Sequence, residues 1–270
     1  MIGLGCVGCQ ISNGGYVAEP GIRLDGAVVL VTGGSRGIGR AIVEAFAAAG
    51  AVVATCGRTP PAASLPATFY LCDVRRADAV REMVDAIGAA HGRIDVLVNN
   101  AGGSPGADAA TASPRFSESV VALNLLGPLH VAQACHRWMA GGGSIVNIAS
   151  VSAIRPSPGT AAYAAAKAGL LGLSRSLAQE WAPTVRVNAI IAGLIGTQQA
   201  ELTYGSAAAQ AAVAASVPLG RLGAGADIAQ AALFLASPLA GFISGAELAV
   251  HGGGERPPFL DIVKAHARGA

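Results

Sequence analysis

Short apolar runs alternate with longer amphipathic or Ala-rich segments along most of this chain. From residue 27 onward, the apolar runs have the length of buried strands and the segments between them have helical length. The runs predict strands at residues 27–31, 51–55, 68–71, 94–98, 144–148, 185–189 and 247–250. The longer segments predict helices at residues 37–49, 77–90, 116–139, 161–181 and 228–236.

Strands that are apolar on both faces need a cover on each side, and their alternation with helices is typical of a parallel sheet. We therefore predict an α/β protein with a doubly wound, seven-stranded parallel sheet of the Rossmann type. Residues 25–255 are expected to form this single domain, because no repeat or linker divides them. Residues 1–24 predict an irregular N-terminal extension, and residues 256–270 a C-terminal tail.

Composition and charge narrow the class of partner. Hydrophobic residues make up 52% of the chain and charged residues 13%, a balance typical of a globular protein. The net charge is only +2 and no run of five basic residues occurs, so neither nucleic acid nor a membrane surface is an expected partner. No apolar run reaches the roughly 18 residues of a membrane helix. We expect a soluble protein that binds a small molecule.

Cysteine and histidine usage gives no indication of a metal site. The five cysteines are an odd number, and no basic stretch precedes an apolar N-terminal segment, so we expect reducing cytoplasm. Cys6 and Cys9 form a C-x-x-C pair that precedes the first strand and lacks a second ligand pair. His130 and His136 are six residues apart on one predicted helix, which places them on different faces.

A glycine-rich turn joins the first predicted strand to the first helix. It reads Thr32-Gly33-Gly34-Ser35-Arg36-Gly37-Ile38-Gly39. Glycines let the backbone approach a pyrophosphate, and the helix N-terminus offers unpaired N–H groups and a positive dipole end. The turn therefore predicts a dinucleotide site at Gly33, Ser35, Arg36, Gly37, Ile38 and Gly39. Taken alone, it is also compatible with a tight strand-to-helix connection that binds nothing.

A tyrosine and a lysine share one face of the predicted helix 161–181. Tyr163 and Lys167 are four residues apart, so both can reach the same ligand. A phenol has a pKa near 10, and a neighbouring ammonium is expected to lower it toward neutrality. Ser150 follows the fifth strand at the carboxyl edge of the sheet, where its hydroxyl can bind a substrate oxygen. Ser152 is the weaker candidate for this role.

These motifs together resemble the compact, single-domain branch of the short-chain dehydrogenase/reductase family, from about residue 24 to residue 254. The resemblance extends over the T-G-x-x-x-G-x-G turn, Asp73-Val74, Asn99-Asn100-Ala101-Gly102, Asn124, Ser150 and the Tyr163-x-x-x-Lys167 pair. It is greatest toward 3-oxoacyl-thioester reductases. Two positions depart from the family pattern: Ala192 stands where Pro is usual, and His251 where Asp is usual.

The resemblance implies a hydride transfer between a nicotinamide and a carbonyl or alcohol carbon. It assigns Tyr163 as acid/base, Lys167 as the group that lowers its pKa, and Ser150 as the residue that positions the substrate oxygen. Asn124 is either a buried amide satisfied by backbone or part of a water relay to Lys167, and both can hold together. Further cofactor contacts implied in this way are Asp73, Val74, Asn99, Ala101, Gly102, Tyr163, Lys167, Ile195 and Thr197.

The end of the second strand indicates which nicotinamide cofactor is bound. An NAD site of this kind places an acid about 20 residues beyond the glycine turn, whereas Gly57 stands there and Arg58 follows. NADP(H) is therefore predicted over NAD, and NAD is the less favoured cofactor. The alternative for Arg58 is an exposed loop charge.

The substrate is expected to be a small carbonyl or alcohol compound of apolar or acyl type, covered by residues 193–217 including Thr197, Leu202 and Tyr204. A non-catalytic NADP(H)-binding regulator or scaffold is the alternative function, against which the intact Ser150, Tyr163 and Lys167 argue. The helices 116–139 and 161–181 are long and apolar over more than one face. Relatives pair such helices across two-fold axes, which implies a homotetramer.

Overall fold

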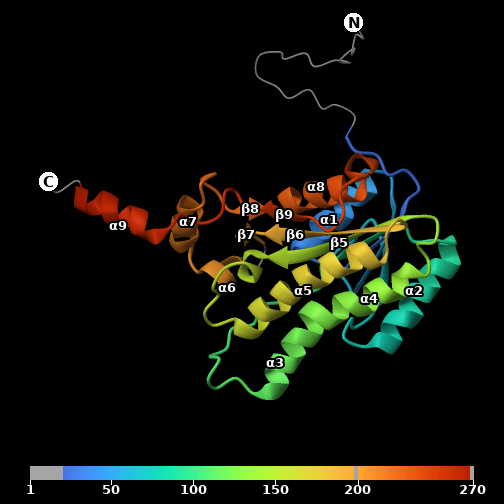
Figure 1. The fold of residues 1–270 in the computed structure, drawn as a ribbon, viewed down its shortest axis with the longest axis horizontal. Helices are drawn as coiled ribbons and strands as arrows, with labels where there is room; N and C mark the ends of the chain where they lie inside the picture. Colours follow the sequence, from blue (N-terminus) through green and yellow to red (C-terminus); the bar gives the residue numbers. More distant parts are fainter. Residues whose placement is uncertain (1–20, 198–199, 268–270) are drawn as a thin grey trace, which may run out of the picture.

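The computed structural model describes residues 21–197 and 200–267. At its centre lies a seven-stranded, all-parallel sheet in the order β3-β2-β1-β4-β5-β6-β9 (Figure 1). Its strands are β1 (Val28–Thr32), β2 (Val52–Gly57), β3 (Thr68–Leu71), β4 (Val96–Asn99), β5 (Gly143–Ser150), β6 (Val185–Ala192) and β9 (Glu247–Val250). This arrangement confirms the predicted fold class.

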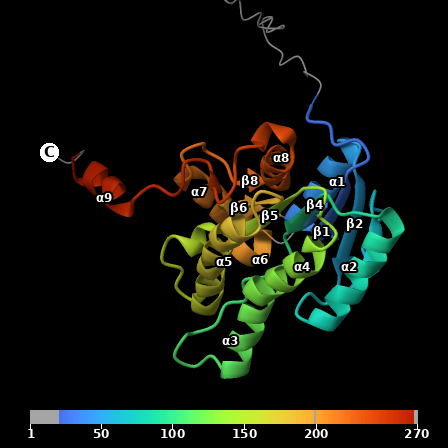
Figure 2. The same ribbon diagram turned by 45° about the vertical axis from the view of Figure 1, so that its right-hand side comes forward.

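Helices cover both faces of the sheet (Figures 1 and 2). One face packs against α1 (Gly37–Ala48) and α8 (Gly225–Ala236), and the other against α2 (Ala77–His91), α4 (Gly127–His136) and α5 (Ala161–Glu180). Each layer has its own apolar core, with fully buried side chains such as Phe46 and Ile228 on one side and Ile87 and Val131 on the other. Burial of both sheet faces explains why the strands consist of almost continuous apolar runs.

The strand order reverses between β1 and β4. The chain runs outward from β1 to β2 and β3, and then returns to place β4 on the other side of β1. Connections that diverge in this way leave a crevice at the carboxyl ends of the two strands, where open α/β sheets bind ligands. Gly33 follows β1 and Ala101 follows β4, so both lie at this crevice.

The expected helix over residues 116–139 is interrupted. α3 (Pro114–Val121) passes into a π-helical turn (Ala122–Leu126) before α4 begins. The Asn124 side chain donates to the carbonyl of Val120, and Pro128 has no N–H to donate to a preceding carbonyl. The Gly127 N–H donates to Ala122 five residues back, which is the π-type spacing. The apolar pattern of the sequence did not predict this π-helical turn within the helix.

The structure contains several elements beyond those predicted. They are β7 (Ile195–Gly196), β8 (Gly223–Ala224), α6 (Ala200–Tyr204), α7 (Ala207–Ser216), α9 (Pro258–Ala267) and two short 3₁₀ turns, Val151–Ala153 and Pro238–Ala240. Helix α9, in the predicted C-terminal tail, projects away from the sheet (Figures 1 and 2). Among the described residues, no helix is both long and apolar enough to cross a membrane.

The predicted N-terminal extension falls mostly outside the described residues, as do Cys6 and Cys9. Residues 21–24 belong to no helix or strand, and the Leu24 N–H donates to the carbonyl of Ala49 at the end of α1. The neighbouring strands β5 and β6 are longer than predicted, and Ser150 is paired with Ala192 at their carboxyl ends.

Candidate active site

The glycine-rich turn needs glycine for both backbone conformation and space. Gly33 and Gly37 have φ angles of +70° and +55°, a region that side chains disfavour. At Gly39, a Cβ atom would lie 2.2 Å from the carbonyl oxygen of Gly33. The turn can therefore bring its backbone, without side chains, to the crevice between β1 and β4.

Three polar side chains hold the turn in place. The Thr55 hydroxyl accepts from the Gly34 N–H at 3.0 Å, and the Asn100 amide donates to the carbonyls of Thr32 and Gly33 at 3.0 and 3.2 Å. The Thr32 hydroxyl in turn accepts from the N–H groups of Asn100 and Ala101. Sequence analysis missed Thr55 and Asn100 as supports of the site. The signal for Asn100 was available in the polar pair that ends β4.

The glycine-rich turn leads directly into α1, whose N-terminus has no side-chain cap. Its N-cap residue, Arg36, is extended and makes no capping hydrogen bond. The first N–H groups of a helix lack intrahelical acceptors and carry the positive end of the helix dipole. Thr197 lies over the same place, since a Cβ on Gly37 would be 3.7 Å from its methyl carbon. The cradle fits the pyrophosphate of a dinucleotide.

Arg58 and Asp73 come just after β2 and β3, at the carboxyl ends of these strands. The Asp73 carboxylate is held by Arg75 through a two-bond ion pair of 2.9 and 2.5 Å. Arg75 lowers the pKa of Asp73, and the charge of Arg58 contributes in the same direction. Arg58 itself is exposed. Val74 is 5% exposed and packs in the core.

The side chain of Asn99 is buried beneath the end of β4, and its role as a cofactor contact stays a prediction. It is 2% exposed, and its amide nitrogen donates to the carbonyl of Pro128 and to the side chain of Asn147. Asn147 donates in turn to Ser174 on α5. The structure therefore places Asn99 in a buried amide network that joins β4, β5 and α5, and places the neighbouring Asn100 against the glycine turn.

Ser150, Tyr163 and Lys167 come together at the carboxyl end of β5. Lys167 is 4% exposed, and its ammonium donates to the carbonyl of Ile148 at 2.7 Å. The same nitrogen lies 5.8 Å from the centre of the Tyr163 ring. A hydrogen bond joins Tyr163 to Ser150. The predicted i, i+4 pair and the serine thus form one cluster.

The electrostatics of this cluster differ from the sequence-based expectation. Burial raises the pKa of Tyr163 above its usual value, and only the hydrogen bond from Ser150 opposes this. Burial also lowers the pKa of Lys167 to about 8. Desolvation of Tyr163 is the larger effect in this arrangement. The role of Lys167 in lowering the pKa of the phenol stays a prediction. A phenol in this state remains protonated at neutral pH.

Asn124 is buried in the π-helical turn. Its amide nitrogen donates to Gly103 at 3.0 Å and to Val120, and its oxygen accepts from the Gly103 N–H at 3.2 Å. A Cβ on Gly102 would lie 2.8 Å from this oxygen and 3.5 Å from the Lys167 nitrogen. The Asn124 side chain is thus hydrogen-bonded to the backbone and also lies close to the Lys167 ammonium. Both predicted roles, a buried structural amide and part of a water relay to Lys167, are compatible with this position.

Ala192 and His251, the two positions that depart from the family pattern, lie close together at the carboxyl ends of β6 and β9. Ala192 pairs with Val250 across β6 and β9, and a Cβ on Gly193 would lie 2.6 Å from the Cα of His251. The Nδ1 atom of His251 is buried without a hydrogen-bond partner. His251 also lines an apolar cavity of about 350 Å³ with Ile195 and Leu219. Ile195 is 8% exposed, and its carbonyl accepts from Tyr204.

A second cavity of about 330 Å³ adjoins Tyr163. It is lined mainly by small and apolar residues, among them Ala107, Phe116, Val120, Gly159 and Ala162. Leu202, which was expected to cover the substrate, is 86% exposed and does not close either cavity. Leu202 lies in the middle of the short helix α6 (Ala200–Tyr204), on its exposed side, which the apolar pattern alone did not reveal.

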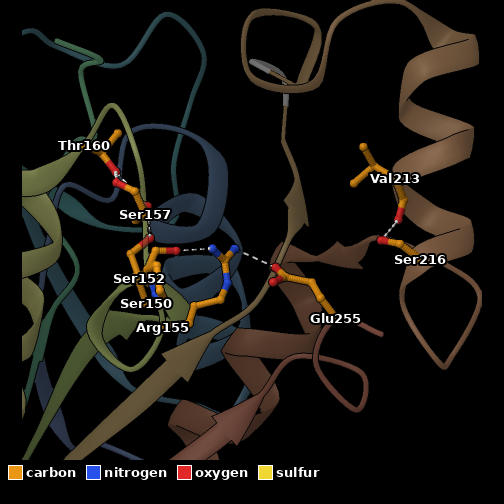
Figure 3. Close-up of polar contacts among 9 residues, drawn as sticks. Ser150, Ser152, Arg155, Ser157, Thr160, Val213, Ser216 and Glu255 are labelled. Atoms are coloured by element: carbon orange, nitrogen blue, oxygen red, sulfur yellow. Dashed lines mark hydrogen bonds and ion pairs between the residues drawn. The ribbon is translucent and has the colours of Figure 1, made fainter. Parts of the chain in front are cut away.

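The loop between Ser150 and α5 has its own polar contacts (Figure 3). The Ser150 hydroxyl accepts from the Ser152 N–H at 3.2 Å. Ser152, Ser157 and Thr160 form a chain of hydroxyl contacts of 3.1 and 2.7 Å. Ser150 is therefore the serine paired with Tyr163, and Ser152 belongs to the chain that fixes the loop. Within the described residues, no group of three or more His, Cys, Asp or Glu side chains is placed to hold a metal ion.

The sequence of this chain is similar to those of known reductases and dehydrogenases. A family model described as enoyl-(acyl carrier protein) reductase matches residues 33–255. The chain is 40% identical over 189 residues to a D-threitol dehydrogenase of Mycolicibacterium smegmatis, a match that spans 65% of this chain and 73% of that protein. It is 36% identical over 215 residues to a 3-oxoacyl-[acyl-carrier-protein] reductase of Thermotoga maritima, which spans 75% and 87% of the two chains.

Solved structures with this fold include an aldohexose dehydrogenase of Thermoplasma acidophilum. It superposes with a TM-score of 0.81 at 34% identity, over 85% of this chain and 94% of that one. A 7α-hydroxysteroid dehydrogenase in complex with NADH and 7-oxo glycochenodeoxycholic acid gives a TM-score of 0.81 at 32% identity, over 87% and 97% of the chains. These relatives act on different substrates.

The buried ammonium of Lys167 generates a prediction about stability. Because its folded pKa of about 8 lies below the ordinary 10.5, the unfolded chain binds the proton more tightly between these values. Burial therefore costs stability fully below pH 8, and the cost disappears as pH rises to 10.5. Relative to Lys167→Met, the wild-type free energy of unfolding should rise by about 2 kcal/mol between pH 7 and pH 9.5. Urea unfolding of both proteins at the two pH values measures this, and parallel pH profiles would contradict it.

Proposed function

The chain belongs to the short-chain dehydrogenase/reductase family, and from that premise we propose that it is an NADP(H)-dependent ketone reductase and alcohol dehydrogenase. Members of this family are oxidoreductases that act on carbonyl or alcohol compounds with NAD(H) or NADP(H). The observation that most strongly supports catalysis here is the cluster of Ser150, Tyr163 and Lys167 at the carboxyl end of β5.

The described residues fit a nicotinamide dinucleotide along the whole crevice. The turn at Gly33 to Gly39 and the uncapped start of α1 would hold the pyrophosphate. Lys167, with an ammonium near the sheet edge, would hold the nicotinamide ribose, and Thr197 lies above the turn. When bound, the nicotinamide supplies or accepts the hydride.

In the direction of reduction, three residues of this chain position the substrate oxygen and supply its proton. The Ser150 hydroxyl donates a hydrogen bond to the substrate carbonyl oxygen and holds it beside the phenol. Tyr163, which burial keeps protonated, transfers its proton to the same oxygen as the negative charge develops there. The ammonium of Lys167 then stabilises the phenolate that remains. A phenol with a pKa at or above 10 is protonated near neutral pH, so the proton donor for reduction is in place.

The alternative is a protein that binds NADP(H) without catalysing a reaction. A binding site needs the glycine turn and a ribose contact, and has no need of a phenol and a serine hydroxyl that share a hydrogen bond. The cavity beside Tyr163 offers a place for the apolar side of a ketone. Its small and apolar lining supports a substrate with an alkyl or acyl substituent.

Substitution of the proton donor tests the assignment of Tyr163. We expect Tyr163→Phe to lower kcat by far more than tenfold, because tenfold corresponds to only about 1.4 kcal/mol and proton transfer contributes more. NADPH binding should stay within twofold of wild type. Tyr70→Phe, which changes a partly buried phenol on the edge strand β3, is the matched control. A Tyr163→Phe protein that keeps more than a tenth of kcat would reject the assignment.

The choice of NADP(H) over NAD(H) depends on the end of β2. Gly57 brings no carboxylate that could bind a ribose 2′-hydroxyl or repel a phosphate, and Arg58 presents an exposed guanidinium beside Asp73. A charge-assisted bond to a 2′-phosphate contributes about 1.5 to 3 kcal/mol, or about 10- to 150-fold in preference. A Cβ on Gly57 would meet only ordinary contacts at 3.5 Å, so the position accepts a side chain.

We therefore expect kcat/KM to favour NADPH over NADH by at least tenfold in the wild-type protein. The double variant Gly57→Asp with Arg58→Ala should reverse the preference, because it removes the attraction and adds repulsion. Steady-state rates with both cofactors provide the measurement. Equal values, or a preference for NADH in the wild type, would show that Arg58 remains in solvent.

Assembly into a homotetramer is proposed from the outward faces of the helices. α5 exposes small residues at Ala165 and Ala168, and Leu126 is 42% exposed on the neighbouring π-helical turn. Small side chains allow two helices to approach closely. Sedimentation at micromolar concentration should give about four times the 26.6 kDa of one chain. A species of 26.6 kDa under these conditions would exclude the tetramer.

A further inference from the structure

A two-stranded parallel sheet joins the segment after β6 to the segment before α8 (Figures 1 and 2). In this sheet Ile195 of β7 pairs with Gly223 of β8, and Gly196 pairs with Ala224. The Gly223 N–H also donates to the carbonyl of Leu194 at 2.9 Å. We call residues 193–197 and 221–224 the strap.

The strap lies next to the start of α1. Thr197 at its end lies over Gly37, because a Cβ on Gly37 would be 3.7 Å from the threonine methyl carbon. Gly225, which directly follows the strap, is equally close: a Cβ there would lie 2.8 Å from the Cβ of Ala41 and 3.5 Å from the carbonyl oxygen of Gly37. The position of the strap therefore sets the space above the turn that fits a pyrophosphate.

The strap is at one end of the proposed cofactor site. Arg58 follows β2 and Ser150 ends β5, on opposite sides of the crevice between β1 and β4. A dinucleotide with its 2′-phosphate at Arg58 would have its nicotinamide beside Ser150. Residues 193–197 follow β6, which neighbours β5, so the strap belongs to the nicotinamide end.

The strap has little support of its own. β7 and β8 contain two residues each, and short two-stranded sheets are marginally stable in water. An apolar cavity of about 350 Å³ lies against Ile195 and Gly223, so dispersion contacts are missing on that side. A fixed position of the strap therefore requires another attachment to the core.

The carboxylate of Asp227 provides this attachment. It accepts from the Ala224 N–H at 2.6 Å and from two guanidinium nitrogens of Arg221 at 2.7 and 2.8 Å. The same guanidinium donates to the carbonyl of Leu222 at 3.1 Å. Asp227 is the third residue of α8, which is anchored in the core by the fully buried Ile228. One side chain thus joins β8 to a rigid helix.

These contacts lie at the surface. The side chains of Arg221 and Asp227 are 56% and 31% exposed, and an ion pair of this exposure contributes little to the free energy of unfolding of the whole domain. Arg221 lowers the pKa of Asp227 to about 2, so the carboxylate is charged at neutral pH. Removal of the carboxylate is therefore expected to act locally, on the strap.

We propose that Asp227 is a positioning residue for cofactor binding: through Ala224 and Arg221 it holds the strap in the place where residues 193–197 contact the nicotinamide half of the dinucleotide. Asp227 acts through the strap and does not touch the cofactor. This inference rests on the proposed NADP(H) dependence, and adds the contact that fixes the cofactor-binding segment to the core.

The experiment measures binding by isothermal titration calorimetry with two nucleotides. NADPH has both halves of the cofactor, whereas 2′,5′-ADP has the adenosine half with its 2′-phosphate and lacks the nicotinamide. Asp227→Ala should raise the Kd of NADPH about tenfold, because the released strap has to be ordered again when the cofactor binds. The Kd of 2′,5′-ADP should stay within about twofold of wild type. A variant with general damage to the fold would lose affinity for both.

Two further variants separate the role of the carboxylate from its size. Asp227→Glu should keep the Kd of NADPH within about twofold, because a glutamate at the third helical position reaches back to the N-cap N–H. Glu247→Ala is the matched control. It removes a carboxylate that is 24% exposed and paired with Arg175, at the amino end of β9 and away from the crevice. This control should keep both wild-type Kd values.

If Asp227→Ala does not fold, Asp227→Asn takes its place. It keeps the size of the side chain and one acceptor oxygen, and should still raise the Kd of NADPH about threefold through loss of the ion pair. A selective loss of NADPH affinity that Asp227→Glu restores supports the inference.

An unchanged Kd of NADPH, an equal loss with both nucleotides, or a glutamate variant as weak as the alanine variant would overturn the inference while leaving the proposed function intact. A wild type that binds NADH in place of NADPH would refute the cofactor assignment alone, and NADH and AMP then replace the two nucleotides in the same test. If the wild type binds neither dinucleotide, the proposed function fails, and the inference fails with it.

Discussion

The burial of the Lys167 ammonium against the carbonyl of Ile148 is the interaction on which the site depends. Burial alone lowers the pKa of Lys167 to about 8, which corresponds to a cost of roughly 3 kcal/mol while the lysine is charged. The packing of α5 on the sheet offsets this cost, since the helix contributes Leu170 and Leu177 to the buried core. The same packing that stabilises α5 therefore fixes the ammonium beside Tyr163.

The crevice and the cluster share one edge of the sheet for a topological reason. Parallel strands bring all their carboxyl ends to the same side, and the reversal of strand order between β1 and β4 opens a space there. The Gly33 turn lies against Ala101 at the base of that space. A dinucleotide bound at the turn would extend toward β5, where Ser150 and Tyr163 lie. Such a placement would bring hydride transfer and proton transfer together at one edge of the sheet.

The sequence was sufficient for the fold and for the grouping of Ser150, Tyr163 and Lys167, because apolar runs and i, i+4 spacing are local signals. It was not sufficient where a side chain competes with the backbone or where distant segments meet. Asn124 in the π-helical turn is hydrogen-bonded to the backbone of Gly103, 21 residues away. The pKa of Tyr163 depends on burial that no spacing reports. An ion pair between Arg155 and Glu255 joins two distant segments for which the sequence offered no motif.

We propose above all that this cluster protonates a carbonyl oxygen while a bound nicotinamide supplies the hydride, and that the protein does more than bind a nucleotide. NADPH that carries deuterium at both positions on C4 of the nicotinamide, mixed in a single turnover with ethyl 3-oxobutanoate, tests this by mass spectrometry of the product. The account predicts one deuterium on the new carbinol carbon with the wild-type protein, and none above background with Tyr163→Phe. Tight binding of the deuterated cofactor with no deuterium in any ketone tested would contradict the account and identify a non-catalytic NADP(H)-binding protein.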